Sequence, residues 1–224
     1  MSTPGAQPDA RRVVLFDFDG VLVHGDTFGL FIRARYAAAW WRKALLLLII
    51  PWLLLKLLFG WRRALRSVVR LALLGLGEAR YGELAHAFAA RLVRRAHHFS
   101  RAGLTVLRQR VEAGDRVLVV TGCEDILVRA VLDGLGVRGV EVLASHLRHG
   151  VLGMRQDWHN IGQRKVEQLA QHGIDAWAVA YSDSALDLPM LSRAGEAVLV
   201  NATPRLCKRV EKALGHSVTR VEWD

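Results

Sequence analysis

The sequence predicts an α/β fold in which a parallel, doubly wound sheet is flanked by helices. An all-helical, strongly apolar insertion is expected after the first strand. Two observations predict this fold. Short apolar runs typical of buried strands alternate with helical segments, as in parallel sheets with crossover helices. Between the first two runs lies a segment rich in Leu, Ala, Trp and Arg, with almost no turn residues. The 224 residues can hold one such domain together with the insertion.

The core elements follow one another in a regular order. Apolar runs predict strands at 12–16, 116–120, 140–144, 177–181 and 197–200. Helices are predicted at 124–135 and 162–172, and again in the basic C-terminal segment. A Thr-Gly turn is expected after the second strand, and the residues around Gly150 predict a hairpin. We therefore expect a polar tail at 1–11, a core formed by 12–28 and 103–224, and the helical insertion at 29–102.

Composition excludes several other classes of protein. Hydrophobic residues make up 52% of the chain and charged residues 23%, which argues against disorder beyond the ends. The two cysteines, Cys123 and Cys207, are too few for a disulfide scaffold, and no CxxC pair suggests zinc. The first residues, MSTPGAQPDARR, contain no apolar stretch, so we expect no secretory signal.

The positive charge of the chain lies in the insertion. Residues 31–101 contain 14 Lys and Arg and 2 acidic residues, a net charge of +12. The remaining residues contain 17 basic and 19 acidic side chains, a net charge of −2. Basic residues beside a Leu-rich segment favour anionic lipid headgroups as the partner. We expect no nucleic-acid binding, because no stacking platform or binding motif accompanies these residues.

Polar residues directly follow three of the predicted strands. They are Asp17 and Asp19 after the first strand, Thr121 and Gly122 after the second, and Asp183 and Asp187 after the strand at 177–181. Because ligands bind at the carboxyl ends of parallel strands, we expect these residues to form one site with Lys165. Carboxylates without a His or Cys cluster favour Mg²⁺ over zinc. The Lys165 ammonium, the Thr121 hydroxyl and the neighbouring amides suit an anionic substrate such as phosphate.

Each of these signals has a simpler explanation when it stands alone. Two aspartates one residue apart are most often solvated turn residues, and a lone helical lysine or Thr-Gly pair is common. The combination favours catalysis, because each member stands at a strand end or on the following helix.

The order of these residues resembles the haloacid dehalogenase (HAD) superfamily of aspartate-nucleophile phosphatases. The segments that carry the resemblance to its four motifs are DFDGV, VVTGC, GQRKVEQL and YSDSALDLPML. The resemblance extends over residues 12–200 and implies a HAD-type Rossmann-like core. The insertion occupies the cap position of phosphoserine-phosphatase-like members. One departure is Val21, where the superfamily usually has Thr.

The resemblance implies a Mg²⁺-dependent phosphomonoesterase. Asp17 would be the nucleophile that forms an aspartyl-phosphate. Asp19 would protonate the leaving alkoxide and then activate the hydrolytic water.

The resemblance also implies which residues hold the metal ion and the phosphate. Mg²⁺ would be bound by Asp17, the backbone carbonyl of Asp19, and Asp183, while Asp187 would support the metal without binding it directly. The phosphoryl oxygens would be bound by Lys165, Thr121 and the Gly122 amide.

The apolar part of the insertion cannot cross a membrane once. Residues 44–59, ALLLLIIPWLLLKLLF, would extend about 24 Å as a helix, whereas a hydrocarbon core measures about 30 Å. The motifs on either side must also meet on one side of any membrane. The alternatives are an interfacial or re-entrant hairpin bent at Pro51, or a second span at 68–77, which Arg70 disfavours. A further alternative is a soluble cap whose apolar faces pack on each other and on the sheet.

We favour contact with a membrane, because aromatic and basic residues surround the apolar run. They are Trp40, Trp41, Trp52 and Trp61, which suit an interfacial belt, and Arg42, Lys43, Arg62, Arg63 and Arg66, which suit anionic headgroups.

A narrower resemblance concerns the substrate. The stretch GDTFGLFIR, the Leu-rich run after it and YSDS resemble the bacterial phosphatidylglycerophosphatase C family. This resemblance implies hydrolysis of phosphatidylglycerol phosphate to phosphatidylglycerol, a step of phospholipid biosynthesis, at the cytoplasmic face of a bacterial inner membrane. One alternative is a phosphatase of a soluble phosphomonoester such as phosphoserine, with the insertion as an anchor or dimer interface. Another is a catalytically silent, membrane-associated interaction module.

Overall fold

The first strand, β1 (Val13–Phe16), lies in the middle of the sheet. The structure is a computed structural model that describes residues 11–223, without the side chain of Arg62. Val14, Leu15 and Phe16 are fully buried, because β2 and β5 pair with β1 on either side and helices cover both faces. A strand covered on both faces needs a continuous apolar run, which is what the sequence supplies. Of the predicted polar tail, residues 1–10 lie outside the described part of the chain.

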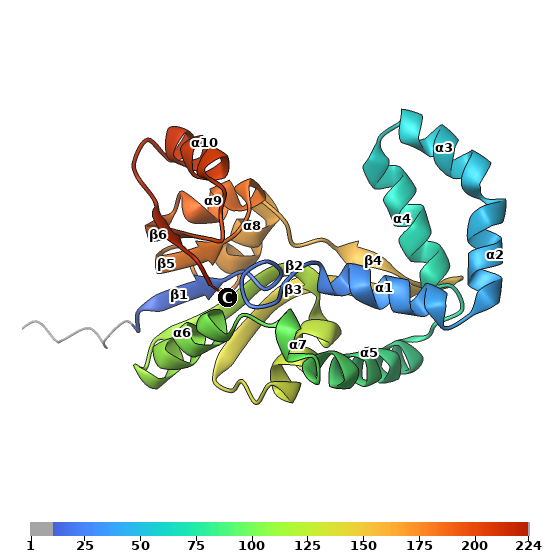
Figure 1. Cartoon of the computed structure of the whole chain (residues 1–224), viewed down its shortest axis with the longest axis horizontal. Coiled ribbons are helices and arrows are strands. Elements are labelled where there is room, and N and C mark those ends of the chain that lie inside the picture. The colour runs from blue at the N-terminus through green and yellow to red at the C-terminus, as the bar shows by residue number, and fades with distance from the viewer. Residues whose placement is uncertain (1–10, 224) are drawn as a thin grey trace, which may run out of the picture.

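The sheet contains seven strands in the order β4-β3-β2-β1-β5-β6-β7. In Figure 1 strands β1, β5 and β6 lie at the left, and β4 extends to the right. The other strands are β2 (Arg116–Glu124), β3 (Val140–Gly150), β4 (Gly153–Trp158), β5 (Trp177–Ser182), β6 (Ala194–Val200) and β7 (Thr219–Val221). Neighbouring strands are parallel, except that β3 and β4 form an antiparallel hairpin at the predicted position. The predicted α/β fold with a mostly parallel sheet is confirmed.

Helices cover both faces of the sheet (Figure 1). One face is covered by α8 (Gln163–Gln171), α9 (Leu188–Leu191) and α10 (Pro204–Leu214). The other is covered by α6 (Arg101–Glu112) and α7 (Asp125–Gly134), with α5 (Glu78–Val93) packed on α7. Two short 3₁₀ turns, η1 (Ala96–His98) and η2 (Ala185–Asp187), connect these elements.

Two strands extend beyond their predicted ends, and one short strand was not predicted. Strand β2 continues to Glu124, so Thr121 and Gly122 lie within the strand and not in a turn. The pairing of β2 with β3 shifts register between Val120 and Glu124, which lets the chain change direction while it remains paired. Strand β3 extends to Gly150 because it continues into the hairpin. The sequence prediction missed β7, since a strand of 3 residues has almost no periodic signal.

Helices α1 (Thr27–Ala37) to α5 follow β1, as the sequence predicts for the insertion. Three of them, α2 (Trp40–Leu48), α3 (Ile50–Leu58) and α4 (Trp61–Ala72), project from the molecule at the right of Figure 1. We call residues 40–72 the apolar arm. The helix is interrupted at Ile49, and Pro51 lies in the first turn of α3. The chain reverses at Gly60, whose φ of 111° suits glycine, whereas one of the alternatives above placed the bend at Pro51.

The base of the apolar arm is tied to the hairpin of the core. The Gly75 amide donates to the Leu152 carbonyl over 2.9 Å. Gly153 has a φ of 125°, and a Cβ there would lie 2.4 Å from the Leu73 carbonyl oxygen. Only glycine allows the backbones to approach so closely, so this contact fixes where the arm leaves the core.

Candidate active site

Asp17 stands directly after β1, where the strand leaves the sheet. Its amide donates to the Tyr181 carbonyl over 2.9 Å, which continues the pairing with β5 by one residue. Its Oδ1 accepts from the Phe18 amide over 2.7 Å. The carboxylate is therefore held by backbone groups and emerges at the carboxyl edge of the sheet, as the sequence predicts.

Lys165 on α8 is buried against two carboxylates. Its side chain is 2% exposed, and its Nζ lies 3.0 Å from Asp17 Oδ2 and 2.9 Å from Asp187 Oδ2. Burial alone would lower the pKa of Lys165, but the two carboxylates outweigh burial and raise it. Lys165 is therefore a cation at neutral pH, with its ammonium aimed at the nucleophile candidate.

Asp187 directs Lys165 and is itself held by Ser182. The Ser182 hydroxyl donates to Asp187 Oδ2 over 2.7 Å, the same oxygen that receives the lysine. Burial acts to raise the pKa of Asp187, but Lys165 and the hydrogen bonds hold it below its ordinary value. Asp187 thus remains a carboxylate and keeps Lys165 in place. Sequence reasoning missed Ser182, which carries no signal apart from its place at the end of β5.

Asp19 is positioned by a residue that the sequence analysis did not single out. Its Oδ1 accepts from the Thr27 hydroxyl over 2.6 Å and from the Thr27 amide over 3.0 Å. Burial raises the pKa of Asp19 to about 6, although the Thr27 hydrogen bonds lower it. A carboxyl with this pKa exchanges a proton readily near neutral pH. The first turn of α1 therefore sets both the direction and the acidity of Asp19.

Gly20 allows Asp183 to approach the loop after β1. Gly20 has a φ of 79°, and a Cβ there would lie 1.9 Å from Asp183 Oδ2. A larger residue would be strained and would also displace the carboxylate. Burial raises the pKa of Asp183, and the charge of Asp187 raises it further.

Thr121 and Gly122, within β2, are held in place by hydrogen bonds to neighbouring residues. The Thr121 hydroxyl accepts from the Cys123 amide over 3.0 Å. The Gly122 carbonyl accepts from the Ser145 hydroxyl over 2.7 Å, and Ser145 in turn accepts from the Asn160 amide over 2.9 Å. The segment before α8 thus holds Gly122 and Lys165 in one arrangement.

All seven predicted site residues line one pocket of about 350 Å³ at the carboxyl edge of the sheet. They are Asp17, Asp19, Thr121, Gly122, Lys165, Asp183 and Asp187. Gly20, Gly25, Asp26, Ile161, Ser184 and Leu186 complete the lining. Val21, the departure from the superfamily pattern, is buried and does not line this pocket.

The pocket contains more acidic groups than basic ones. Among its described lining residues Lys165 is the only lysine or arginine, against the carboxylates of Asp17, Asp19, Asp26, Asp183 and Asp187. Burial raises the pKa of Asp17, and the Asp187 charge adds to it against the opposing effect of Lys165. Carboxylates crowded in this way fit a cation with oxygen ligands. In the described part of the chain no three His, Cys, Asp or Glu side chains form a ready metal cluster. The Asp19 side chain accepts from Thr27, and the metal-binding role of its backbone carbonyl stays a prediction.

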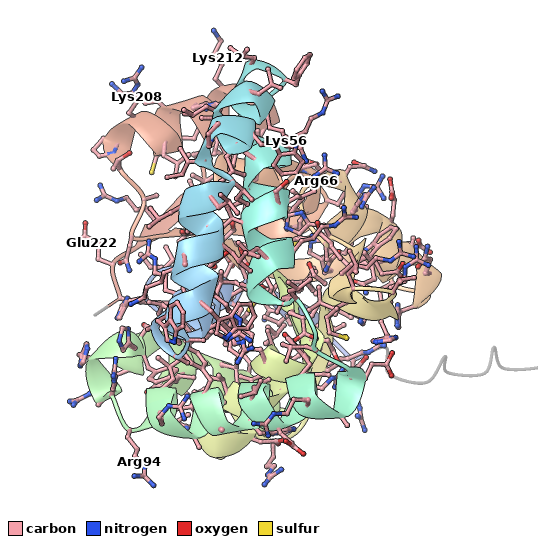
Figure 2. The ribbon with its side chains drawn as sticks, turned by 90° about the vertical axis from the view of Figure 1, so that its right-hand side faces the viewer. Lys56, Arg66, Arg94, Lys208, Lys212 and Glu222 are labelled. Atoms are coloured by element: carbon pink, nitrogen blue, oxygen red, sulfur yellow. The ribbon has the colours of Figure 1, made fainter. Side chains whose placement is uncertain are left out.

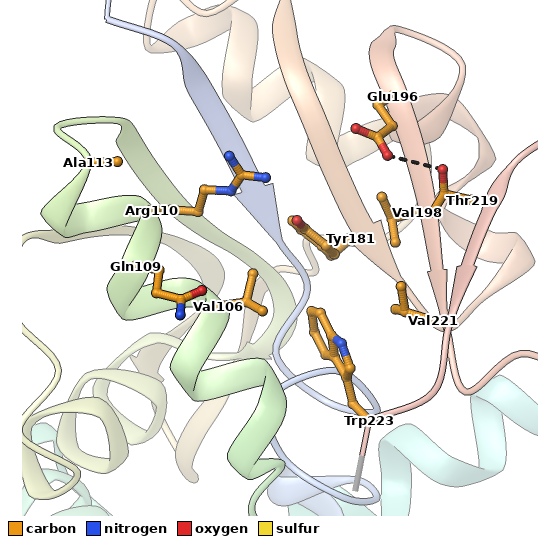
Figure 3. Close-up of a pocket in the computed structure, with 10 residues that line it drawn as sticks. All are labelled: Val106, Gln109, Arg110, Ala113, Tyr181, Glu196, Val198, Thr219, Val221 and Trp223. Atoms are coloured by element: carbon orange, nitrogen blue, oxygen red, sulfur yellow. Dashed lines mark hydrogen bonds between the residues drawn. The ribbon is translucent and has the colours of Figure 1, made fainter.

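A second pocket of about 340 Å³ lies between α6 and the edge formed by β5, β6 and β7 (Figure 3). Tyr181 and Trp223 form its apolar side, with ring centres 5.2 Å apart. Arg110 points toward Tyr181, and Glu196 accepts a hydrogen bond from Thr219 over 3.0 Å. None of the predicted site residues lines this pocket, so the predicted chemistry belongs to the first one.

Comparisons with known proteins agree with this fold. A protein of unknown function from Bordetella pertussis Tohama I is similar in structure, with a TM-score of 0.69 and 21% identity over 93% of this chain and 98% of the other. A substrate-bound phosphoserine phosphatase has a TM-score of 0.57 and 20% identity, over 96% and 94% of the two chains. Cytosolic 5′-nucleotidase IIIB bound to cytidine has a TM-score of 0.57 and 13% identity, over 94% and 80%. No curated protein sequence matches the chain.

The family follows from the sequence match. A family model described as haloacid dehalogenase-like hydrolase matches residues 14–192, which include every predicted site residue. The expectation of a hydrolase with a HAD Rossmann-like fold is confirmed. This chain therefore belongs to the haloacid dehalogenase-like hydrolases.

Proposed function

We propose that the chain is a Mg²⁺-dependent phosphomonoesterase that works through an aspartyl-phosphate on Asp17. The contact of buried Lys165 with both Asp17 and Asp187 carries this proposal. It places an oriented carboxylate beside a permanent cation, which is what attack on a phosphate dianion requires. The similarity in fold to a phosphoserine phosphatase and a nucleotidase is consistent with the same chemistry.

The proposed reaction has two successive steps, formation and hydrolysis of the aspartyl-phosphate, and the residues of the pocket take part in both. Asp17 attacks phosphorus, and the P–O bond to the alcohol breaks as Asp19 donates its proton to the departing alkoxide. Asp19 then takes a proton from water, which attacks phosphorus and releases phosphate from Asp17. Lys165 and the polar groups at Thr121 and Gly122 bind the phosphoryl oxygens. The pKa of about 6 allows Asp19 to serve in both directions.

Asp17, the backbone carbonyl of Asp19, and Asp183 would hold Mg²⁺ in this pocket. When bound, Mg²⁺ would supply positive charge that lowers the repulsion between the carboxylates and the phosphate. The side chains of Asp187 and Ser182 contact Lys165 and each other, so their contribution is to position the lysine.

Phosphate release from Asp17→Asn tests the nucleophile. The variant should lose turnover of every phosphomonoester while its thermal unfolding stays close to that of the wild type. Asp175→Asn is the matched control, because Asp175 is exposed and outside the pocket. Substantial turnover by Asp17→Asn, with or without Mg²⁺, would show that another group attacks phosphorus.

The substrate that we propose is a phospholipid phosphate at an anionic membrane surface, with phosphatidylglycerol phosphate as the first choice. The apolar arm supports this proposal because it exposes large apolar side chains. They are Trp40, Trp41, Leu47, Leu48, Ile50, Trp52, Leu54, Leu55, Leu57, Leu58, Phe59, Trp61 and Leu65. Exposed apolar side chains gathered on one segment in this number mark a membrane or protein contact.

Figure 2 shows α3 and α4 side by side at the end of the apolar arm, with Lys56 and Arg66 near its tip. Lys56 Nζ donates to the Ser67 hydroxyl over 2.9 Å and lies 3.5 Å from the centre of the Trp52 ring. The hydrogen bond to Ser67 joins the two helices, while Leu48 remains 75% exposed and Leu58 80% exposed. This exposure supports contact with a membrane over the alternative in which the apolar faces pack on each other and on the sheet.

The run at 68–77, considered above as a second span, is packed within the protein. Ala72, Leu73 and Leu76 are buried in the larger core cluster. None of the helices that the structure describes has both the length and the apolar character needed to cross a bilayer. We propose that the apolar arm contacts the cytoplasmic face of a bacterial inner membrane by insertion into its interface.

Phosphate release from mixed micelles separates the candidate substrates. Phosphatidylglycerol phosphate, phosphatidic acid, phosphoserine and a nucleoside monophosphate would be compared with and without Mg²⁺. Preference for the lipids would support the proposal. Activity confined to the soluble esters would retain the phosphatase and refute the lipid substrate. Absence of turnover on all four with intact vesicle binding would favour the catalytically silent interaction module.

Vesicle sedimentation tests the apolar arm itself. The double variant Leu48→Glu/Leu58→Glu should lose binding to vesicles that contain phosphatidylglycerol, because it places two charges on the apolar surface. Val151→Glu is the matched control, since Val151 is a fully exposed apolar residue on the core hairpin and outside the arm. Equal binding by both variants would refute the assignment of the arm.

A further inference from the structure

Two arginines at the base of the apolar arm are buried without a carboxylate partner. Arg35 lies in the last turn of α1 and Arg42 in the first turn of α2, and each residue is 8% exposed. The Nε atom of each is buried and has no hydrogen-bond partner in the structure. Among the described residues neither side chain forms an ion pair, whereas Arg116, Arg129 and others do. A buried cation without compensation costs free energy, so such a pair calls for an explanation.

The surroundings of the pair concentrate positive charge. Burial lowers the pKa of Arg35. The positive charges of Arg42 and Arg80 lower it further, because they repel the charged Arg35 guanidinium. Arg80 is itself paired with Glu83. The guanidinium of Arg42 lies 4.4 Å from the centre of the Trp41 ring, a contact that a cation favours but that adds no negative charge. The corner therefore offers an anion two guanidinium groups that no described acid neutralises.

The backbone around the pair is held in place by a separate contact. The Tyr36 hydroxyl donates to the Val68 carbonyl over 2.7 Å and so ties α1 to α4. Arg35 and Arg42 thus stand on two helices, α1 and α2, which pack on each other and on α4, and not on a free loop. Side chains that are ordered in advance bind an anion at a smaller entropic cost.

The position of the pair decides which anion it suits. Helix α1 begins at Thr27, which holds Asp19 in the pocket. Arg35 lies eight residues further on, about 12 Å along the helix. On its other side α2 leads directly to the exposed apolar residues of the arm. An anion bound here would lie between a phosphomonoester in the pocket and acyl chains against the arm.

We propose that Arg35 and Arg42 form a binding site for the phosphodiester group of a membrane lipid. A phosphodiester is the group that stands between the headgroup and the acyl chains of a glycerophospholipid, and guanidinium groups bind phosphate oxygens in pairs. This inference deepens the proposed function and rests on the lipid surface proposed there. It does not depend on turnover.

Vesicle binding by matched charge variants tests this site. Arg35→Gln and Arg42→Gln would be compared with Arg33→Gln, which removes the same charge from an exposed position on α1. The vesicles would contain phosphatidylcholine with or without phosphatidylglycerol. Loss of a charge-assisted hydrogen bond should weaken binding to the anionic vesicles about tenfold or more for Arg35→Gln and Arg42→Gln. Arg33→Gln should weaken it by less than about threefold.

Three outcomes of the binding experiments would overturn the inference, and thermal unfolding provides a fourth. Equal weakening by all three variants would show that only net charge matters, and no weakening would show that the pair does not bind lipid. Displacement of the wild type from vesicles by millimolar inorganic phosphate, lost in Arg42→Gln, would make the pair a site for free phosphate. Thermal unfolding adds a separate check, because removing an unpaired buried cation should leave Tm unchanged or raise it. A marked fall in Tm for both variants would assign the arginines a structural role.

The experiments distinguish failure of the proposed function from failure of this inference. If lipid phosphate is not hydrolysed but the two variants still lose vesicle binding selectively, the inference stands without the lipid substrate. If lipid phosphate is hydrolysed and the variants bind vesicles like the wild type, the inference fails alone.

Discussion

Tyr81→Phe removes one hydroxyl from the contact that joins the insertion to the core. Tyr81 on α5 is fully buried, and its hydroxyl donates to Glu124 Oε2 over 2.6 Å. The same oxygen accepts from the Leu127 amide over 3.0 Å, so Glu124 also caps the N-terminus of α7. The variant leaves this carboxylate buried with one donor fewer.

The size of the effect follows from the charge of the acceptor. A hydrogen bond to a charged group contributes about 1.5–3 kcal/mol to the free energy of unfolding. For a domain of this length 1 kcal/mol corresponds to about 2–4 °C in Tm. We therefore expect Tyr81→Phe to lower Tm by about 3–12 °C at pH 7.

The loss should depend on pH in a definite direction. Burial raises the pKa of Glu124 above its ordinary value, while the hydrogen bond from Tyr81 lowers it. A carboxyl with a raised pKa in the folded state makes stability fall as the pH rises through that pKa. Removal of Tyr81 raises the pKa of Glu124 further, so the variant loses most at pH 7. As the pH falls through the raised pKa of Glu124, the loss should shrink toward that of a neutral hydrogen bond, so it should be smaller at pH 4 than at pH 7.

Thermal unfolding followed by circular dichroism at pH 4 and pH 7 measures both effects. Tyr36→Phe is the matched control, because the Tyr36 hydroxyl donates to a neutral carbonyl, that of Val68. Its loss should be about 0.5–1.5 kcal/mol and the same at both pH values. If Tyr81→Phe loses no more than Tyr36→Phe, or loses equally at pH 4 and pH 7, the argument from a charged acceptor is wrong.

Two further variants test the pocket. Gly20→Ala should lower phosphate release about hundredfold, because its Cβ would displace Asp183. Gly25→Ala imposes similar backbone strain at a φ of 88° with no atom within 4 Å of the new Cβ, so equal losses would refute the clash with Asp183. Thr27→Val removes the hydroxyl that holds Asp19 and should lower kcat about tenfold or more on an alkyl phosphate. The loss should be smaller on p-nitrophenyl phosphate, whose leaving group needs no proton, and an equal loss would contradict the acid role of Asp19.

Local patterns in the sequence were sufficient to predict the α/β class of the fold and most of its strands. The strand β1 can be predicted because a strand covered on both faces consists of a nearly continuous apolar run. The acidic residues that follow this run mark the end of the strand. The order of polar residues at strand ends predicted one pocket, since the carboxyl ends of parallel strands share an edge. The charge of the insertion was likewise visible from residue counts alone.

Contacts between distant residues could not be read from these patterns. Thr27 holds Asp19, Ser182 holds Asp187, and Tyr81 holds Glu124 only because the folded chain brings separate elements together. Arg35 and Arg42 have no carboxylate partner among the described residues, and this too is a tertiary fact, because a sequence of charges does not show which of them meet. Whether the leucines of the arm pack inward or stay exposed depended on the same geometry. Sequence periodicity shows which face of a single helix or strand is apolar. The packing of the whole chain decides which other elements that face contacts.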